Sequence, residues 1–143
     1  MRKIFYIFIA LTSLASCEID RFNDGYFGSN WQLRSIDTLA TGGICDMSNS
    51  YIYWAIENHI LQVRDIDNGN LKIFFQYEKH GDSLTIYSPL LEINKDERIE
   101  IQNDSLLTPL GIRSPLTTYF IEHLGHKYLT LRDDSLRLHF QEY

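Results

Sequence analysis

The side chains best suited to metal or acid–base chemistry in this chain of 143 residues are five histidines, which are spread along the sequence. Only His123 and His126 lie close together, and they flank a predicted turn without a cysteine or a paired carboxylate at the spacing of a metal site. We interpret both as solvated turn residues. The sequence therefore predicts neither a metal site nor a cofactor.

Motifs for nucleophilic catalysis and for phosphate binding are missing from the sequence. No serine occupies a Gly-x-Ser-x-Gly elbow, and no glycine-rich phosphate loop is present. Neighbouring carboxylates such as Asp133 and Asp134 fall where the chain is expected to turn, which explains them better than acid and base roles in one cavity. We therefore expect a protein that is not an enzyme.

Aromatic side chains, which make up 13% of the chain, are the strongest candidates for ligand contact. The candidate ligand-binding residues lie on predicted strands that must turn one face inward: Trp54, Phe75, Tyr77 and Tyr119. Two interpretations stay open, namely a pocket in which tyrosine hydroxyls orient a flat or apolar ligand, and a filled core. For Trp31 and Phe140 we favour core packing.

Apolar residues at every second position predict strands through the first half of the chain. We expect strands over residues 30–38, 51–56, 60–66, 71–78 and 84–88, with residues 39–50 as the longest irregular piece. Asp67-Asn68-Gly69-Asn70 is the clearest hairpin turn, because Asn-Gly readily adopts positive φ. Residues 57–59 form either a second turn or a bulge within one long strand. Pro89 is expected to end its strand, since proline has no N–H to donate.

The second half of the chain continues the same pattern. Residues 92–96 form a connection and residues 98–102 a short strand, and residues 104–111 form a single helical turn that Gly111 ends. Three regular strands follow over residues 117–123, 127–132 and 135–141, joined by tight turns. Such consecutive hairpins predict an antiparallel meander.

Eight or nine strands with short connections predict an all-β protein, because parallel crossovers need a dozen or more residues. Closure of the meander into a barrel removes the unpaired edges that it would otherwise expose. A barrel of about eight strands either fills with side chains or holds one small ligand. A two-sheet sandwich is the alternative, and the sequential hairpins disfavour it.

The N-terminus has the anatomy of a signal peptide, with Arg2 and Lys3 followed by an apolar run over residues 4–14. That run is shorter than the roughly 20 residues of a permanent membrane span. Leu14-Ala15-Ser16-Cys17 resembles the lipobox of bacterial lipoproteins, which implies cleavage before Cys17 and acyl chains on its sulfur and amine. An ordinary secretory signal with an incidental Cys17 is the alternative.

These features divide the chain into a signal peptide (1–16), a lipidated tether (17–26) and one β-barrel domain (27–143). Without Arg2 and Lys3 the mature chain keeps 11 basic side chains against 19 acidic ones, a formal net charge of −8. Nucleic acid is therefore not an expected partner, because phosphate contacts need clustered Lys and Arg. Cys45 then has no cysteine to pair with, and we expect it to be half-buried near a loop.

The barrel domain resembles a known family. Gly28-Ser-Asn-Trp31-Gln-Leu on the first strand, together with Tyr119-Phe-Ile-Glu-His-Leu, Tyr128-Leu-Thr-Leu and Leu136-Arg-Leu-His-Phe near the end, is similar to the small lipocalin-like (calycin-type) lipoproteins of Bacteroidetes-type bacteria. The spacing of Gly28 and Trp31 departs from the lipocalin Gly-x-Trp by one residue. The resemblance implies a lipocalin-like β-barrel with an apolar cup.

Two functions follow as expectations. The first is a monomeric lipoprotein of the cell envelope, anchored by Cys17 at the outer membrane, that binds a small apolar or aromatic ligand without catalysis. The second is a solid barrel that binds another envelope protein through exposed loops such as residues 39–50. A hollow interior favours the first, and a filled interior beside an exposed apolar patch favours the second.

Overall fold

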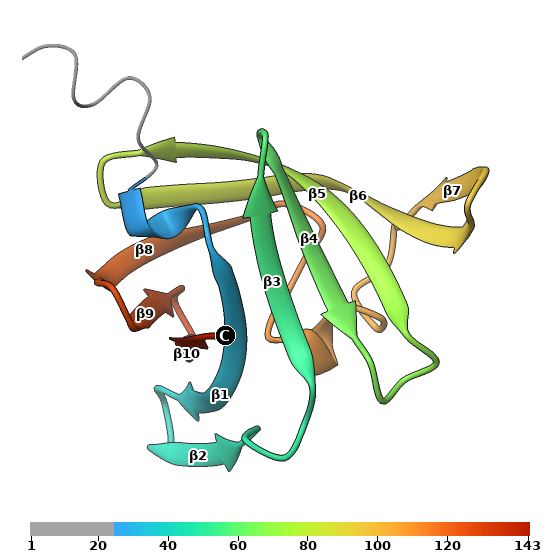
Figure 1. Ribbon diagram of the computed structural model, residues 1–143. Coiled ribbons are helices and arrows are strands. Elements are labelled where there is room, and N and C mark those ends of the chain that lie inside the picture. Colours follow the sequence, from blue (N-terminus) through green and yellow to red (C-terminus); the bar gives the residue numbers. More distant parts are fainter. Residues whose placement is uncertain (1–24) are drawn as a thin grey trace, which may run out of the picture.

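The computed structural model describes residues 25–143, which form a closed antiparallel β-barrel (Figure 1). Eight strands make the barrel in the order β10-β9-β8-β6-β5-β4-β3-β1, and β1 pairs back to β10 to close it. The strands are β1 (Asn30–Thr38), β2 (Gly43–Asp46), β3 (Ile52–Glu57), β4 (Ile60–Asp65), β5 (Leu71–His80), β6 (Ser83–Asn94), β7 (Glu97–Glu100), β8 (Thr117–Leu124), β9 (Tyr128–Arg132) and β10 (Leu136–Glu142). The prediction of a closed all-β meander is confirmed.

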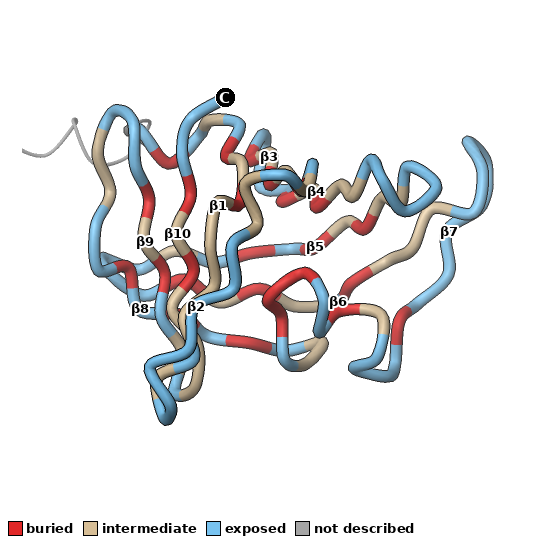
Figure 2. Tube along the Cα trace, turned by 90° about the horizontal axis from the view of Figure 1, so that it is seen from below, coloured by how far each residue is buried: buried red, intermediate tan, exposed pale blue. Residues whose placement is uncertain are grey.

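The alternation seen in the sequence places one apolar row of each barrel strand inside. On β1, Trp31 and Leu33 are fully buried, and on β10, Leu138 and Phe140 occupy the equivalent inward positions. Figure 2 shows buried positions distributed along the barrel strands, whereas β7 is exposed along its length. The predicted core roles of Trp31 and Phe140 are thus confirmed.

Two tight turns on either side of β4 agree with the sequence. Asn58 and His59 both have positive φ, 50° and 66°, and they form the two-residue turn from β3 to β4. Gly69 and Asn70 have φ of 63° and 55° in the next turn, from β4 to β5. Both positions require the left-handed conformation that Asn and Gly tolerate best.

The prediction that Pro89 ends its strand is wrong. β6 runs on to Asn94, because its register against β5 shifts between Phe74 and Gln76. Ser88 has a φ of 51° at this point, and the bulge that it forms places Pro89 where its missing N–H breaks no ladder. The carbonyl oxygen of Pro89 accepts a hydrogen bond of 3.1 Å from the N–H of Ile101.

Residues 39–50 are also more regular than predicted. They contain β2, which pairs with residues 35–38 of β1. Cys45 lies on this strand and is exposed rather than half-buried, with its Sγ 3.6 Å from Sδ of Met47. The strand escaped prediction because all four of its residues are exposed, so no apolar alternation marks it.

One end of the barrel is filled by the segment that links β7 to β8. Its 3₁₀ turn η2 (Thr108–Leu110) stops at Gly111, which has a φ of 82°, as the sequence predicts. Leu107, Leu110 and Ile112 of this segment are buried in the core. We call this the plug end.

The other end of the barrel carries the first described residues and the C-terminus. The 3₁₀ turn η1 (Gly25–Phe27) sits there, and Trp31 fixes it by donating a hydrogen bond of 3.2 Å from its indole Nε1 to the carbonyl of Phe27. The predicted signal peptide (1–16) and Cys17 lie outside the described residues. Within residues 25–143, no helix has the length and apolar character needed to cross a bilayer.

Candidate functional site

The four aromatic residues predicted to contact a ligand all point from the strands into the barrel. Trp54, Phe75 and Tyr119 are at most 1% exposed, and Tyr77 is 8% exposed. The rings of Trp54 and Tyr119 lie 6.0 Å apart between centroids, and Trp54 and Phe140 lie 4.9 Å apart. The interior row of the barrel is therefore occupied by large side chains in mutual contact.

One polar atom in this interior has no partner among the described residues. The indole N–H of Trp54 is fully buried and donates to no described atom. An unsatisfied buried donor costs about 1–3 kcal/mol. Trp54 is thus a weak point in an otherwise apolar interior.

The hydroxyl of Tyr119 has a structural partner. It donates a hydrogen bond of 3.0 Å to the carbonyl of Gly111, which ends η2, and thereby joins β8 to the plug. Burial raises the pKa of Tyr119 well above its usual value, so the hydroxyl stays protonated. This bond accounts for a tyrosine at a core position.

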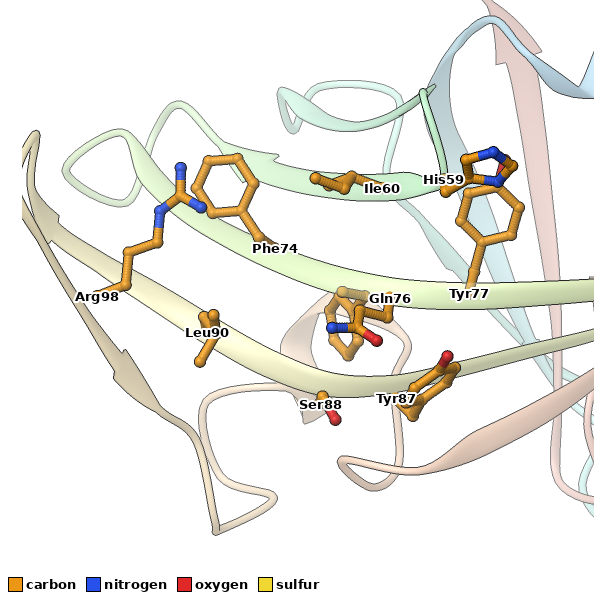
Figure 3. A pocket seen from close by; sticks show the side chains of 10 residues that line it. His59, Ile60, Phe74, Gln76, Tyr77, Tyr87, Ser88, Leu90 and Arg98 are labelled. Atoms are coloured by element: carbon orange, nitrogen blue, oxygen red, sulfur yellow. The ribbon is translucent and has the colours of Figure 1, made fainter.

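An open groove lies on the outer face of β4, β5 and β6. Its volume is about 420 Å³, within the roughly 300–1,000 Å³ typical of small-molecule sites. Figure 3 shows Phe74 and Arg98 at one end of this outer groove and His59 and Tyr77 at the other. The residues that line it are His59, Ile60, Phe74, Phe75, Gln76, Tyr77, Tyr87, Ser88, Leu90 and Arg98.

The strand register explains why these side chains meet. Gln76 is opposite Ile60 of β4 on one side and Tyr87 of β6 on the other, so the three share the outer face. β4 begins at Ile60, which leaves the end of β5 beyond Gln76 without a β4 partner. Tyr77 reaches the groove at that end from the interior row.

Two backbone irregularities shape the groove. Ser88, at the bulge of β6, and His59, in the β3–β4 turn, are two of the four described residues other than glycine that have positive φ. Such conformations cost free energy and concentrate at functional sites, where the surrounding structure enforces them. Pairing of β7 with β6 places Arg98 opposite Glu92, and Arg98 reaches the groove from there.

Arg98 is the charged side chain of the groove lining. Its guanidinium carbon lies 3.9 Å from the centroid of the Phe74 ring, a cation–π contact. Glu92, the cross-strand partner of Arg98, pairs with Lys72 at 3.5 Å instead, and Arg98 forms no ion pair with a described residue. Within the part of the chain that the structure describes, the groove lining includes no Asp or Glu, although the whole chain has a net charge of −6.

The histidines lie elsewhere, apart from His59. His126 is exposed in the β8–β9 turn, with Nδ1 3.6 Å from Oε2 of Glu142, in agreement with the predicted solvated turn residue. His123 is exposed too, but it lies on β8, opposite Thr130, rather than in the predicted turn. Among residues 25–143, no three His, Cys, Asp or Glu side chains come together in a group that could hold a metal ion.

A serine, a histidine and an aspartate also meet on the outer face of β1 and β10. Nε2 of His139 lies 2.7 Å from Oδ2 of Asp37, and Ser35 is the cross-strand partner of His139. A catalytic triad needs a hydrogen bond from the serine to the histidine as well. No described hydrogen bond joins Ser35 to His139. We therefore interpret the contact between His139 and Asp37 as one that stabilises the pairing of β1 with β10.

The structure brings only part of the predicted site to the groove. Phe75 and Tyr77 line it, whereas Trp54 and Tyr119 lie together in the interior. Prediction missed Phe74, Tyr87 and Arg98. The signal for Phe74 is an aromatic side chain in a row whose other members are Lys72, Gln76 and Glu78. Nothing in the sequence marks Arg98, because the pairing of β7 with β6 brings it there.

Comparison with known proteins identifies the fold. The sequence matches the family model described as a lipocalin-like domain over residues 11–143. A crystal structure of a lipocalin-like protein from Bacteroides uniformis aligns with a TM-score of 0.64 and 19% identity, over 83% of this chain and 100% of the other. An uncharacterized protein from Bacteroides eggerthii aligns with a TM-score of 0.55 and 15% identity, over 80% of this chain and 98% of the other. No curated protein matches the sequence.

Proposed function

Because the chain belongs to the lipocalin-like domain family, we propose that it binds a small flat or apolar ligand and that its site is the outer groove. The observation that carries this proposal is the groove itself, an open concave surface with aromatic walls and a few polar groups. Small-molecule sites have this composition. A ligand in the barrel interior would instead have to displace packed aromatic side chains such as Trp54.

The electrostatics of the groove favour a ligand that carries a negative charge. Arg98 supplies a guanidinium that has no carboxylate partner among residues 25–143, and the amide of Gln76 and the hydroxyls of Tyr87 and Ser88 supply further hydrogen-bonding groups. A guanidinium binds a carboxylate through two parallel hydrogen bonds. The ligand class that fits is an apolar or aromatic acid.

Native mass spectrometry of the mature protein purified from its source tests the proposal. We expect a retained small-molecule mass, or capture of an added naphthalene carboxylate, in the wild-type protein. Ile60→Glu, which places a negative charge in the groove, should abolish the adduct. The matched control is Ile44→Glu, which alters a hollow on the outer face of β1 and β10. No adduct in the wild-type protein, or an adduct that survives Ile60→Glu, would contradict the proposal.

We also propose that acyl chains on Cys17 anchor the protein to the bacterial outer membrane. Stable anchoring takes two lipid signals, and lipobox processing supplies more than one acyl chain. Cys17→Ala should abolish labelling by a radioactive fatty acid and release the protein from the membrane fraction. Membrane retention unchanged by Cys17→Ala would refute the anchor.

A second candidate function is binding to another envelope protein, and one observation favours it. The β6–β7 hairpin projects beyond the barrel (Figure 1), with Ile93 and Ile99 exposed on it. In the described chain β7 pairs with β6 alone, so its outer edge is open to an added strand. Crosslinking from residue 99 in intact cells would capture such a partner, and crosslinks confined to lipid would argue against it.

A further inference from the structure

The tether brings the end of the barrel that holds η1 close to the proposed anchor. Cys17 and Gly25 are eight residues apart in the sequence, so even a fully extended chain spans at most about 29 Å between them. Gly25 belongs to η1, which Trp31 fixes to the barrel through the carbonyl of Phe27. An anchor at Cys17 therefore holds this end near the bilayer.

Three exposed tyrosines belong to elements at the same end, and the ring of one of them, Tyr143, also packs against Tyr53 of β3, 4.9 Å between centroids. Tyr26, Tyr128 and Tyr143 are 54%, 55% and 78% exposed. We call the surface formed by Tyr26, His126, Lys127, Tyr128 and Tyr143 the tether face.

Contacts between elements make the tether face one continuous surface. The rings of Tyr26 and His126 lie 5.5 Å apart between centroids. The N–H of Glu142 donates a 2.8 Å hydrogen bond to the carbonyl of Lys127, and the N–H of Tyr143 donates a 3.0 Å bond to the carbonyl of Asn30. The β8–β9 turn, η1 and the C-terminus are thus held together.

Tyrosine suits the boundary between lipid and water, because its ring is apolar and its hydroxyl stays hydrated. Lys127 adds a long apolar stem with a charged tip that can reach lipid phosphates. Glu142 adjoins this face, and its carboxylate lies 3.6 Å from Nδ1 of His126. The three tyrosines are therefore the groups that suit the face to a membrane surface.

We propose that the tether face docks on the lipid headgroup region of the membrane in which the protein is anchored. This inference rests on the proposed acylation of Cys17, because the tether converts a weak contact of three tyrosines into an intramolecular one with a high effective concentration. In the docked state the barrel stands on the bilayer with its tether face against the headgroups, and the plug end points into the solvent. The outer groove then runs from the membrane side at His59 toward solvent at Arg98 (Figure 3).

The test measures how well a water-soluble nickel chelate reaches a nitroxide label on the full lipidated protein. The protein is placed in vesicles of phosphatidylethanolamine and phosphatidylglycerol. One label is attached at Lys127→Cys in a Cys45→Ser background, on the tether face. The reference label is attached to native Cys45, which is exposed on β2 opposite Ile36, away from the tether face. The test variant combines Tyr26→Ser, Tyr128→Ser and Tyr143→Ser, and its matched control is Tyr51→Ser, an exposed tyrosine beside the β4–β5 turn.

In the protein that keeps all three tyrosines, we expect the label at residue 127 to be at least about threefold less accessible to the chelate than the label at Cys45, since docked groups enter the headgroup layer. The triple variant should remove this difference while the protein still floats with the vesicles, and Tyr51→Ser should leave it unchanged. Equal accessibility at both sites with the three tyrosines present, or an unchanged difference in the triple variant, overturns docking while leaving the anchor in place. If the purified protein lacks the mass of the acyl chains and fails to float with the vesicles, the proposed anchor is wrong, and docking fails with it.

Discussion

The indole of Trp54 gives the sharpest prediction at the scale of single residues. The buried ring stabilises the fold, but its N–H is buried without a described partner, and this unsatisfied donor lowers the stability. Trp54→Phe keeps most of the ring and removes that donor. We expect the free energy of unfolding to fall by no more than about 1 kcal/mol in Trp54→Phe, against about 3–5 kcal/mol in Trp54→Ala.

Urea denaturation of the three proteins, followed by circular dichroism, measures these differences. A loss in Trp54→Phe close to that in Trp54→Ala would show that the N–H makes a stabilising hydrogen bond. The indole would then be a satisfied core group.

Glu122 gives a prediction about pH. Its carboxylate accepts hydrogen bonds of 2.7 and 3.3 Å from the guanidinium of Arg137, and this contact lowers the pKa of Glu122 below its usual value. A carboxylate with a lowered pKa in the folded state stabilises the fold above its unfolded pKa, and the effect is lost as the pH falls through the folded pKa. Glu122→Gln should cost about 0.5–1 kcal/mol at neutral pH.

That cost should shrink as the pH falls from neutral through the lowered pKa of Glu122, because the carboxyl is then protonated in the folded and the unfolded protein alike. Urea denaturation of the wild-type protein and Glu122→Gln across this pH range measures it. Glu57→Gln, at an exposed strand end, is the control. A difference that persists in acid would mean that Glu122 acts through packing rather than through its charge.

At the scale of elements, the bulge of β6 determines the shape of the outer groove. Ser88 adopts a φ of 51° there, which a residue with a β-carbon occupies at a cost. Ser88→Gly should therefore raise the free energy of unfolding by about 0.5–1 kcal/mol. Ser88→Val should lower it by about 1–2 kcal/mol, because a β-branched side chain clashes in the left-handed region.

The control is Thr85→Gly, at a regular position of the same strand, which should instead destabilise the protein by at least about 0.5–1 kcal/mol, because it also removes the 2.9 Å hydrogen bond between the hydroxyls of Thr85 and Thr118. Thermal unfolding of the three variants shows whether each substitution raises or lowers the stability of the protein. A stability loss in Ser88→Gly equal to that in Thr85→Gly would contradict the left-handed bulge.

The turns and strands show where prediction from sequence succeeded and where it failed. Turns with their own chemistry, such as Asn68-Gly69 and Gly111, were predictable because local φ requirements select those residues. Strands with an inward apolar row were predictable because successive side chains of a strand point to opposite faces. Pro89 misled because a bulge accommodates it, and β2 was missed because its residues are exposed throughout. Both features depend on the neighbouring strand rather than on the local sequence.

For the whole molecule, the closed barrel was predictable but the groove was not. Short connections and edge protection predict closure, and β1 pairs with β10 as expected. The predicted ligand contacts were inward aromatic residues, and only Phe75 and Tyr77 of these line the groove. The other walls come from outward residues of three strands, which meet only because of register and the β6 bulge.

The anionic ligand in the outer groove is the central claim, and one measurement tests it most directly. Isothermal titration calorimetry measures the affinity for a naphthalene carboxylate and for the corresponding neutral carboxamide. The proteins compared are the wild type, Arg98→Gln and the control Arg113→Gln. Arg113 serves as the control because its guanidinium already pairs with Asp133 at 2.8 Å. We predict that the carboxylate binds wild-type protein about tenfold more tightly than the amide, a difference of about 1.4 kcal/mol. The preference should vanish in Arg98→Gln and persist in Arg113→Gln. Equal affinity for the two compounds, or a preference that survives Arg98→Gln, would contradict the claim.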